Sequence, residues 1–319
     1  MTATIRTNVI RLENGNLWVH SPLYPTEEYC ALLDDLGGTV EHVVLPCNAF
    51  EHKGALKPFS KRYPQASIWI SPGQYNPLGS CGRTLEDGPC NMGVKVDGIL
   101  GDSATTDASN LPPWASEFDY TTLYVNLPEN AGPVSETAFL HKPTSTLITV
   151  DALAYIPKGP DVPEIFSTYF DKSTIQNDPS FWTKSVLQSV FLPLRTDEND
   201  QYPGFEAIQE RLLRAPILRG FNDARAPNEA RTFVSTIVSS WKFDRILTNH
   251  FASPIVAGPQ DVKNAFSYLF VENDNDFGSD ALPPIACQDW DLLQGLNDAI
   301  AEYKLGAPAT FDYQRGCIK

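Results

Sequence analysis

The amino-acid sequence predicts an α/β layered fold. Two apolar stretches rich in β-branched residues, VEHVVLP (40–46) and ASIWI (66–70), are typical of buried strands. Between them, residues 53–62 have the composition of a short helix, and Tyr63-Pro64 closes it. Alternation of strand, helix and strand is characteristic of folds in which helices cover a sheet.

The N-terminal part predicts a hairpin followed by a helix. NVIRLENGNLWVH (8–20) contains two β-rich runs around Asn14-Gly15, which is a strong turn signal. Thr26 is a suitable N-cap for a helix over EEYCALLDDL (27–36), and Gly37-Gly38 ends that helix.

The middle of the chain predicts a long loop and then three strands. Residues 73–118 are rich in Gly, Pro, Asn and Ser, and we expect a loop there that contains one short strand, VKVDGIL (94–100). Strands follow at TTLYVN (121–126), ETAFLH (136–141) and TLITVDA (146–152). Residues 142–145 join the last two strands as a second hairpin.

The C-terminal half predicts more helix than strand. Residues 157–204 form an irregular, partly helical insertion, and a helix over 227–241 starts at a proline. Its apolar residues recur at helical spacing, and we interpret them as a core-facing stripe. A strand at FDRILTNH (243–250) and helices over 260–270 and 287–303 follow. We expect one domain over residues 1–319, with insertions at 73–118 and 157–204 and a helical extension at 271–319.

Composition and charge exclude some classes of function. The 319 residues carry a formal net charge of −15, which argues against a nucleic-acid partner because phosphate binding needs Lys/Arg patches. No apolar run approaches the length that spans a membrane. The start, MTATIRTNVIRL, has no signal or transit character. We therefore expect a soluble protein that is cytoplasmic or has lost a targeting segment.

Six cysteines are present, and no C-x-x-C pair occurs. Zinc-ribbon and thioredoxin-like sites therefore have no support. Cys81 and Cys90 flank a glycine-rich loop and can pair in an oxidising compartment. We favour the alternative of free thiols in a reducing compartment.

Five side chains carry the candidate chemistry. His52 follows a predicted strand and begins a helix, with Glu51 directly before it, while His141, Asp151 and His250 stand at strand ends. Each alone is equally compatible with a turn former or a structural histidine, as we interpret His20 and His42. Loops at one edge of a sheet gather functional groups, and imidazole with carboxylate suits zinc, iron or manganese. Their joint placement therefore favours a metal site.

Three long stretches carry a family resemblance: EHKGALKPFSKRYPQASIW (51–69), AFLHKPTSTLITVDA (138–152) and FDRILTNHFASPIVAGPQDVKNAF (243–266). With LWVHSP near the start, their order resembles the metallo-β-lactamase superfamily over roughly residues 8–270. It is most similar to a branch defined by a domain of unknown function, found in plant and algal plastid proteins and in bacteria. The resemblance implies a four-layer αββα sandwich whose metal edge is formed by loops from both sheets.

The superfamily's first metal motif, H-x-H-x-D-H, is altered in this chain. Laid over residues 47–52, it has Cys47 and Ala49 in place of the first two histidines and Glu51 in place of the aspartate. His52 matches the last histidine. Cys47 can bind as a thiolate, and its alternative, which we favour, is a small buried side chain.

The remaining family positions match in type. His141 matches the histidine after the second motif, Asp151 the bridging acid, and His250 the final histidine. Without two imidazoles of the first motif, the resemblance implies at most one ion. Its ligands are Glu51, His52, Asp151 and His250, and His141 lies near it. We expect a divalent transition metal, zinc first, with iron or manganese as alternatives.

Three functions are compatible with this set of residues. The first is a metal-dependent hydrolase that uses one ion on an unknown small-molecule substrate. The second is a non-catalytic pseudoenzyme that acts as a binding or assembly protein with a protein partner, in a plastid if the branch resemblance extends to location. The third is a mononuclear iron oxidoreductase.

Overall fold

The computed structural model describes residues 4–74, 93–125, 133–159, 161–168, 170–270 and 282–319. The chain forms two compact units. The first, here called the sheet unit, comprises Ile5–Val150 and Phe243–Asn249. The second, the helical unit, contains Asp151–Lys242 and His250–Lys319 together with Thr4. The organisation as a single domain stays a prediction.

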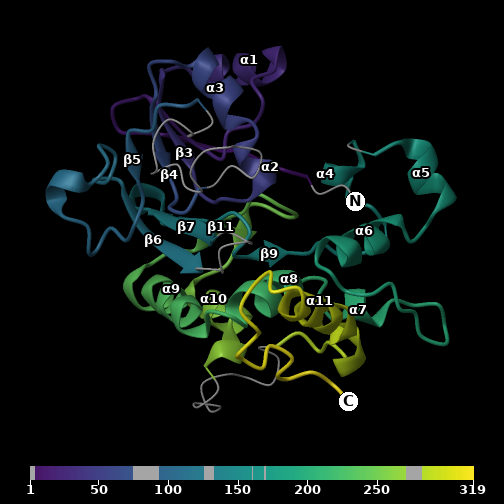
Figure 1. Cartoon of the computed structure of the whole chain (residues 1–319). Coiled ribbons are helices and arrows are strands. Elements are labelled where there is room, and N and C mark those ends of the chain that lie inside the picture. The colour runs from purple at the N-terminus through teal and green to yellow at the C-terminus, as the bar shows by residue number, and fades with distance from the viewer. Residues whose placement is uncertain (1–3, 75–92, 126–132, 160, 169, 271–281) are drawn as a thin grey trace. The chain divides into compact units, whose positions relative to one another are not determined.

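The first sheet of the sheet unit contains five strands in chain order (Figure 1). β1 and β2 pair antiparallel, and Gly15 turns the chain between them at φ +85°, so the predicted hairpin is confirmed. β2, β3, β4 and β5 then pair parallel. The bounds are Asn8–Arg11 for β1, Leu17–His20 for β2, Val40–Leu45 for β3, Ser67–Ile70 for β4 and Gly98–Ile99 for β5.

Helices cover one face of this sheet. α1 (Glu27–Leu36) begins as predicted, because the hydroxyl of Thr26 accepts a hydrogen bond from the backbone N–H of Tyr29. The helix predicted over 53–62 starts earlier and is broken in two, α2 (Phe50–Lys53) and α3 (Leu56–Arg62). Between helices and sheet lies a core that includes Leu17, Val19, Leu33, Val43, Leu56 and Phe59.

The second sheet of this unit has the order β11-β8-β7-β6. β6 and β7 pair antiparallel, as do β7 and β8, whereas β8 and β11 pair parallel. The turn at Lys142–Thr144 and left-handed Ser145 makes the second predicted hairpin. The bounds are Phe118–Val125 for β6, Val134–His141 for β7, Thr146–Ile148 for β8 and Arg245–Leu247 for β11.

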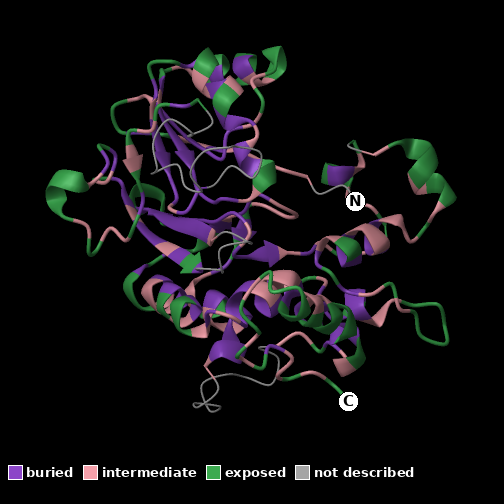
Figure 2. Cartoon of the chain, viewed as in Figure 1, coloured by how far each residue is buried: buried purple, intermediate pink, exposed green. Residues whose placement is uncertain are grey.

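The two sheets face each other across an aromatic core. Trp18 of the first sheet stacks on Phe118 of the second with ring centroids 4.4 Å apart. Both are buried, as are most strand residues of the two sheets (Figure 2). The members of this core include Trp18, Val44, Trp69, Trp114, Phe118, Tyr120, Phe139 and Ile148. Helices, first sheet and second sheet therefore form successive layers of the predicted α/β fold.

The helical unit contains the partly helical insertion predicted over 157–204. α9 (Pro227–Ser240) starts at its proline and buries Ala230, Phe233, Val234 and Ile237, as the stripe predicts. The further elements are β9 (Ala154–Tyr155), α4 (Glu164–Ser167), α5 (Lys172–Asn177), α6 (Phe181–Ser189), α7 (Pro203–Glu206), β10 (Leu212–Leu213), α8 (Pro216–Leu218), a π-helix (Arg219–Asp223), β12 (Ile255–Val256), α10 (Pro259–Ala265) and α11 (Asp291–Glu302).

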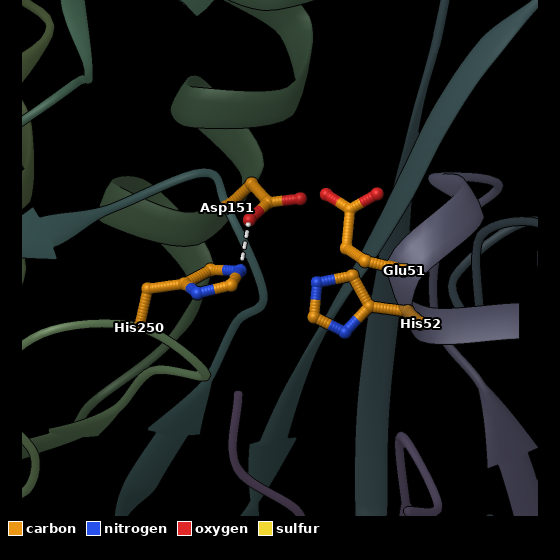
Figure 3. A group of neighbouring side chains, drawn as sticks. All are labelled: Glu51, His52, Asp151 and His250. Carbon is orange, nitrogen blue, oxygen red and sulfur yellow. Dashed lines mark ion pairs between the residues drawn. The ribbon is translucent and has the colours of Figure 1, made fainter. Parts of the chain in front are cut away.

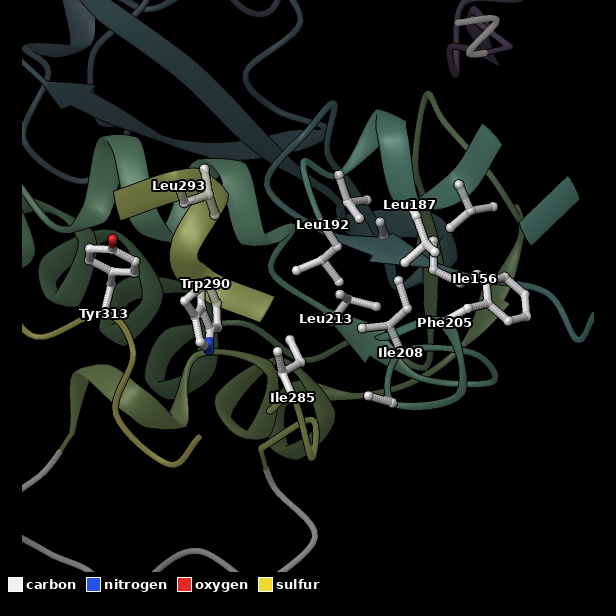
Figure 4. Close-up of a cluster of buried hydrophobic side chains, with 14 of the residues drawn as sticks. Ile156, Leu187, Leu192, Phe205, Ile208, Leu213, Ile285, Trp290, Leu293 and Tyr313 are labelled. Carbon is white, nitrogen blue, oxygen red and sulfur yellow. The ribbon is translucent and has the colours of Figure 1, made fainter. Parts of the chain in front are cut away.

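This unit has its own hydrophobic core (Figure 4). The labelled side chains come from two parts of the chain, residues 156–213 and residues 285–313, and they include Phe205, Ile285, Trp290, Leu293 and Tyr313. A disulfide between Cys287 and Cys317 ties the C-terminal segment beside this core. The sequence did not indicate this pair, since the two cysteines are 30 residues apart.

Other sequence-based expectations meet the structure in part. Cys81 and Cys90, for which free thiols are expected and pairing is the alternative, lie outside the described residues, as does the centre of the 73–118 loop. Only Gly98–Ile99 of the predicted strand 94–100 is a strand. Within the described residues, no helix is long and apolar enough to cross a membrane.

Removal of the disulfide tests its contribution to stability. In the chain-entropy model, opening a closed loop of this length costs about 3.5 kcal/mol of unfolding free energy. We expect chemical denaturation of the double variant Cys287→Ser/Cys317→Ser to show this loss of unfolding free energy. Cys30→Ala, at a free cysteine of the sheet unit, is the control, because it opens no closed loop. Two additional reactive thiols in the unreduced, unfolded wild-type protein contradict the pairing.

Candidate metal centre

Four metal-ligating side chains converge in the structure. Glu51, His52, Asp151 and His250 each offer one ligand atom, and these atoms all lie within 4.8 Å of one another (Figure 3). They come from three segments remote in sequence: α2, the turn after β8 and the turn after β11. These are four of the five side chains that the sequence indicates for a metal site; the fifth, His141, is expected near the ion.

Strand register explains why Asp151 and His250 are neighbours. β8 and β11 are parallel, and Ile148 pairs with Leu247. Asp151 lies three residues beyond Ile148, and His250 lies three residues beyond Leu247. The two segments therefore reach the same edge of the sheet side by side. The pairing continues past the strands, because the N–H of Asn249 donates to the carbonyl of Val150 at 3.4 Å.

A buried acid holds the start of the Asp151 turn. Glu136 on β7 is 6% exposed, and its Oε1 accepts a hydrogen bond of 2.8 Å from the backbone N–H of Val150. Val150 and Asn249 end the two segments of the sheet unit, so Asp151 and His250 are each one peptide bond from it. The backbone that carries both ligands is therefore fixed by the second sheet.

The turn before α2 is fastened to the same sheet. The backbone N–H of Asn48 donates to the carbonyl of Ser135, and the N–H of Ser135 donates to Oδ1 of Asn48 at 3.0 Å. Nε2 of Gln74 donates to the carbonyl of Cys47 at 2.9 Å. α2 thus begins from an anchored loop, which places Glu51 and His52 beside the edge of the second sheet.

Burial changes steeply across the four side chains. His52 is 1% exposed, the side chains of His250 and Asp151 are 13% and 23% exposed, and Glu51 is exposed. The group is therefore closed at His52 and open to water at Glu51. An open side is what a catalytic ion needs and a purely structural one lacks.

Hydrogen bonds constrain the protonation of His250. Its Nδ1 lies 2.8 Å from the carbonyl oxygen of Thr4, which only accepts, so Nδ1 carries a proton. Its Nε2 lies 3.0 Å from Oδ1 of Asp151. A lone pair on Nε2 facing that carboxylate oxygen is favourable when a cation lies close to both atoms. The alternative is a second ring proton that makes the histidine cationic.

The donor set fits one transition-metal ion. Zinc bonds of about 2.0–2.2 Å place tetrahedral donors about 3.3–3.6 Å apart. Donor atoms already within 4.8 Å of one another reach that spacing by movements of about 1 Å. Two imidazoles with two carboxylates also suit iron and manganese.

His141 is at the other edge of the sheet, which corrects its expected place near the ion. β7 and β8 form an antiparallel hairpin in which His141 pairs with Thr146. Asp151 lies five residues farther along, about 16 Å at strand spacing. Nδ1 of His141 lies 2.7 Å from the hydroxyl of Thr144, and desolvation by burial lowers the pKa of the ring. It is not a member of the four-residue group found among the described residues.

Two residues of the altered family motif stand apart from the four donors. Cys47 is 2% exposed and forms an isolated β-bridge with Glu136. Ala49 has no ligand atom and is the N-cap residue of α2. Within the described part of the chain, the clustered donors are those of the single-ion arrangement that the resemblance implies.

His20 is a neutral histidine buried between the sheets. It is 0% exposed, and its ring lies 5.6 Å from that of Trp18. Its Nδ1 lies 3.4 Å from the side-chain nitrogen of Asn8, which also donates to Oδ1 of Asn249 at 3.0 Å. Desolvation by burial, and then the charge of His52, lower the pKa of His20 to about 3.

Comparison with known proteins identifies a family. A model of the family described as "Domain of unknown function (DUF4336)" matches residues 1–191 and 164–268. No curated protein matches the chain.

Solved structures give distant likenesses. The metal-soaked Flv1 flavodiiron core from Synechocystis sp. PCC6803 is 12% identical over 85% of this chain and 54% of its own, at a TM-score of 0.46. A putative diflavin flavoprotein A 5 fragment from Nostoc sp. PCC 7120 is 12% identical over 85% of each chain, at 0.43. DIM-1 metallo-β-lactamase exposed to ceftazidime is 8% identical over 84% of this chain and 97% of its own, at 0.36.

These likenesses concern the fold alone. The chain spans about half the length of the flavodiiron core. The two facing sheets, with helices over the first, make up the layered α/β arrangement that the sequence predicts.

The burial of His20 predicts a pH dependence of stability. Between pH 6.5 and about 3 the unfolded chain binds a proton that the folded chain excludes, so the stability falls as the pH falls below 6.5. At pH 5 the loss from this residue is about 2 kcal/mol. Denaturant unfolding at pH 7 and pH 5 measures it, and His20→Phe is expected to have the smaller difference. Equal differences in the two proteins contradict the assignment.

Proposed function

The chain belongs to the DUF4336 family, and we propose that it is a hydrolase that works with a single divalent metal ion held by Glu51, His52, Asp151 and His250. One observation carries the proposal: four donors of the right chemistry, from three remote segments, have their ligand atoms within 4.8 Å. Zinc is the first candidate, with iron and manganese as alternatives. The substrate is an unidentified small molecule.

Charge balance supports a divalent ion. Two carboxylates and two neutral imidazoles carry a charge of −2, which a divalent cation cancels. The carboxylates of partly buried Asp151 and exposed Glu51 lie side by side and repel each other, and a cation between them removes that cost. The backbone carbonyl at Nδ1 of His250 directs its Nε2 toward the same point.

A divalent ion supplies Lewis acidity that lowers the pKa of a water molecule. The protein side chains have distinct tasks around it. His52 is buried and His250 nearly so, and both would bind the ion through ring nitrogens. Asp151 would bind it through a carboxylate oxygen and balance its charge. Glu51, the most exposed member, would yield its place on the ion to a water molecule, and its carboxylate would then take a proton from that water and pass it to the leaving group.

A second function has its own support. Asp151 and His250 already form an ion pair of 3.0 Å, and Nδ1 of His52 lies 2.9 Å from the hydroxyl of Ser21. A polar cluster with such contacts is compatible with a non-catalytic binding or assembly protein, in which an ion clips the segments together. A cytoplasmic or plastid location for either function stays a prediction.

Metal content tests the site. Protein purified without added ions is expected to hold a stoichiometric transition metal, measured by inductively coupled plasma mass spectrometry. His250→Ala and Asp151→Asn lose a ligand, so their metal affinity falls by more than the roughly 10–100-fold typical of outer-shell partners. His141→Ala, at the opposite edge, is the matched control and retains the metal. Uptake that is equal in all four proteins contradicts the ligand set.

Turnover separates the two functions. Initial rates are measured on a panel of esters, thioesters, phosphodiesters and lactams with the metal-loaded protein. Loss of the proton acceptor in Glu51→Gln is expected to reduce kcat by about 10²–10⁴-fold. Glu41→Gln, on the first sheet, is the matched control and leaves the rate unchanged. Stoichiometric metal with no rate above that of His250→Ala favours the binding protein.

A further inference from the structure

We infer that Ser21 is a positioning residue that orients the ring of His52 for metal binding, an inference that rests on the proposed function. The hydroxyl oxygen of Ser21 lies 2.9 Å from Nδ1 of His52. Figure 3 shows the other ring nitrogen of His52 directed toward Asp151 and His250. Ser21 therefore engages the ring on the side away from the ion.

The backbone conformation of Ser21 is unfavourable for a residue with a side chain, which indicates a role for its hydroxyl group. Ser21 follows β2 and adopts φ +55°, a left-handed conformation that costs a non-glycine residue about 1–2 kcal/mol. Its N–H donates to the carbonyl of Val44 at 2.9 Å, which fixes this turn. Glycine fits such a position without strain, so a buried serine there is explained by what its hydroxyl binds.

His52 needs an anchor outside its own helix. α2 has only four residues, and its N-cap residue, Ala49, has no side-chain group to accept a capping hydrogen bond. A helix this short gains little from its own hydrogen bonds. The ring of His52 is 1% exposed, and the hydroxyl of Ser21 ties it to the end of β2 in the first sheet.

The contact also selects the tautomer. A histidine that binds an ion through Nε2 keeps its proton on Nδ1, and that proton needs an acceptor. For His250 the acceptor is the carbonyl of Thr4, and for His52 it is the hydroxyl oxygen of Ser21. Both imidazoles are thereby set to present Nε2 toward the same point.

Ser21→Gly tests the inference without strain, because glycine suits the backbone while the hydroxyl is lost. Zinc and cobalt affinities are measured by chelator competition, and cobalt absorption reports the ligand geometry. We expect the affinity to fall about 10–100-fold and the cobalt spectrum to change, while the unfolding midpoint of the metal-free protein changes little, because relief of the left-handed strain offsets the lost hydrogen bond. Thr144→Ala removes the matching hydroxyl contact of His141 and leaves the metal affinity unchanged.

Wild-type affinity and spectrum in Ser21→Gly overturn the inference while leaving the metal site standing. If the wild-type protein takes up no zinc, cobalt, iron or manganese, the proposed function fails first. The inference is then decided by long-range ¹H–¹⁵N NMR of His52 in metal-free protein. A single Nδ1–H tautomer that becomes mixed in Ser21→Gly supports positioning by Ser21, and an unchanged tautomer overturns it.

Discussion

The parallel register of β8 and β11 is the constraint on which the candidate site depends. Ile148 pairs with Leu247, and the two segments run side by side in the same register for three further residues, to Asp151 and His250. A shift of one residue in this pairing moves one ligand by about 3.3 Å and turns its side chain to the other face. The hydrogen bond from Asn249 to Val150 and the bond from Val150 to Glu136 protect this register just before the two ligands.

Beside the fixed pair of Asp151 and His250, the candidate site has firmly oriented imidazoles on one side and a solvent-exposed carboxylate on the other. His52 is buried and tied to Ser21, and His250 is tied to a backbone carbonyl, so both imidazoles are oriented by groups outside the donor set. Glu51 stands exposed on a helix of one turn. This arrangement suits the proposed single-ion hydrolysis, in which two oriented imidazoles hold the ion and one carboxylate faces solvent.

Several elements of the fold and the four donors could be predicted from the sequence, because each of them has a local sequence signal. The Asn14-Gly15 turn, the Thr26 cap and the proline start of α9 each depend on one or two residues. The four donors could be named because each follows a recognisable strand within a stretch that resembles the family. The prediction for His141 was wrong although it used the same rule. Two strands joined by a tight hairpin end at opposite edges of a sheet, and the hairpin at residues 142–145 already implied this.

What sequence could not show is which polar residues support the ligands. Glu136 lies between Ser135 and Thr137 near the start of β7, and its bond to Val150 exists only through the pairing of β7 with β8. Ser21 is an ordinary turn residue in the sequence, and its contact with His52 spans 31 positions. The Cys287–Cys317 disulfide likewise depends on how the C-terminal segment returns to its unit. Such partners are set by tertiary structure and leave no periodic or local pattern.

X-ray absorption of the zinc-loaded protein tests the central claim most directly. Four nitrogen and oxygen ligands at about 2.0–2.2 Å, two of them imidazoles, are predicted, since the four donors supply two histidines and two carboxylates. A sulfur ligand at about 2.3 Å, or fewer than two imidazoles, contradicts the account.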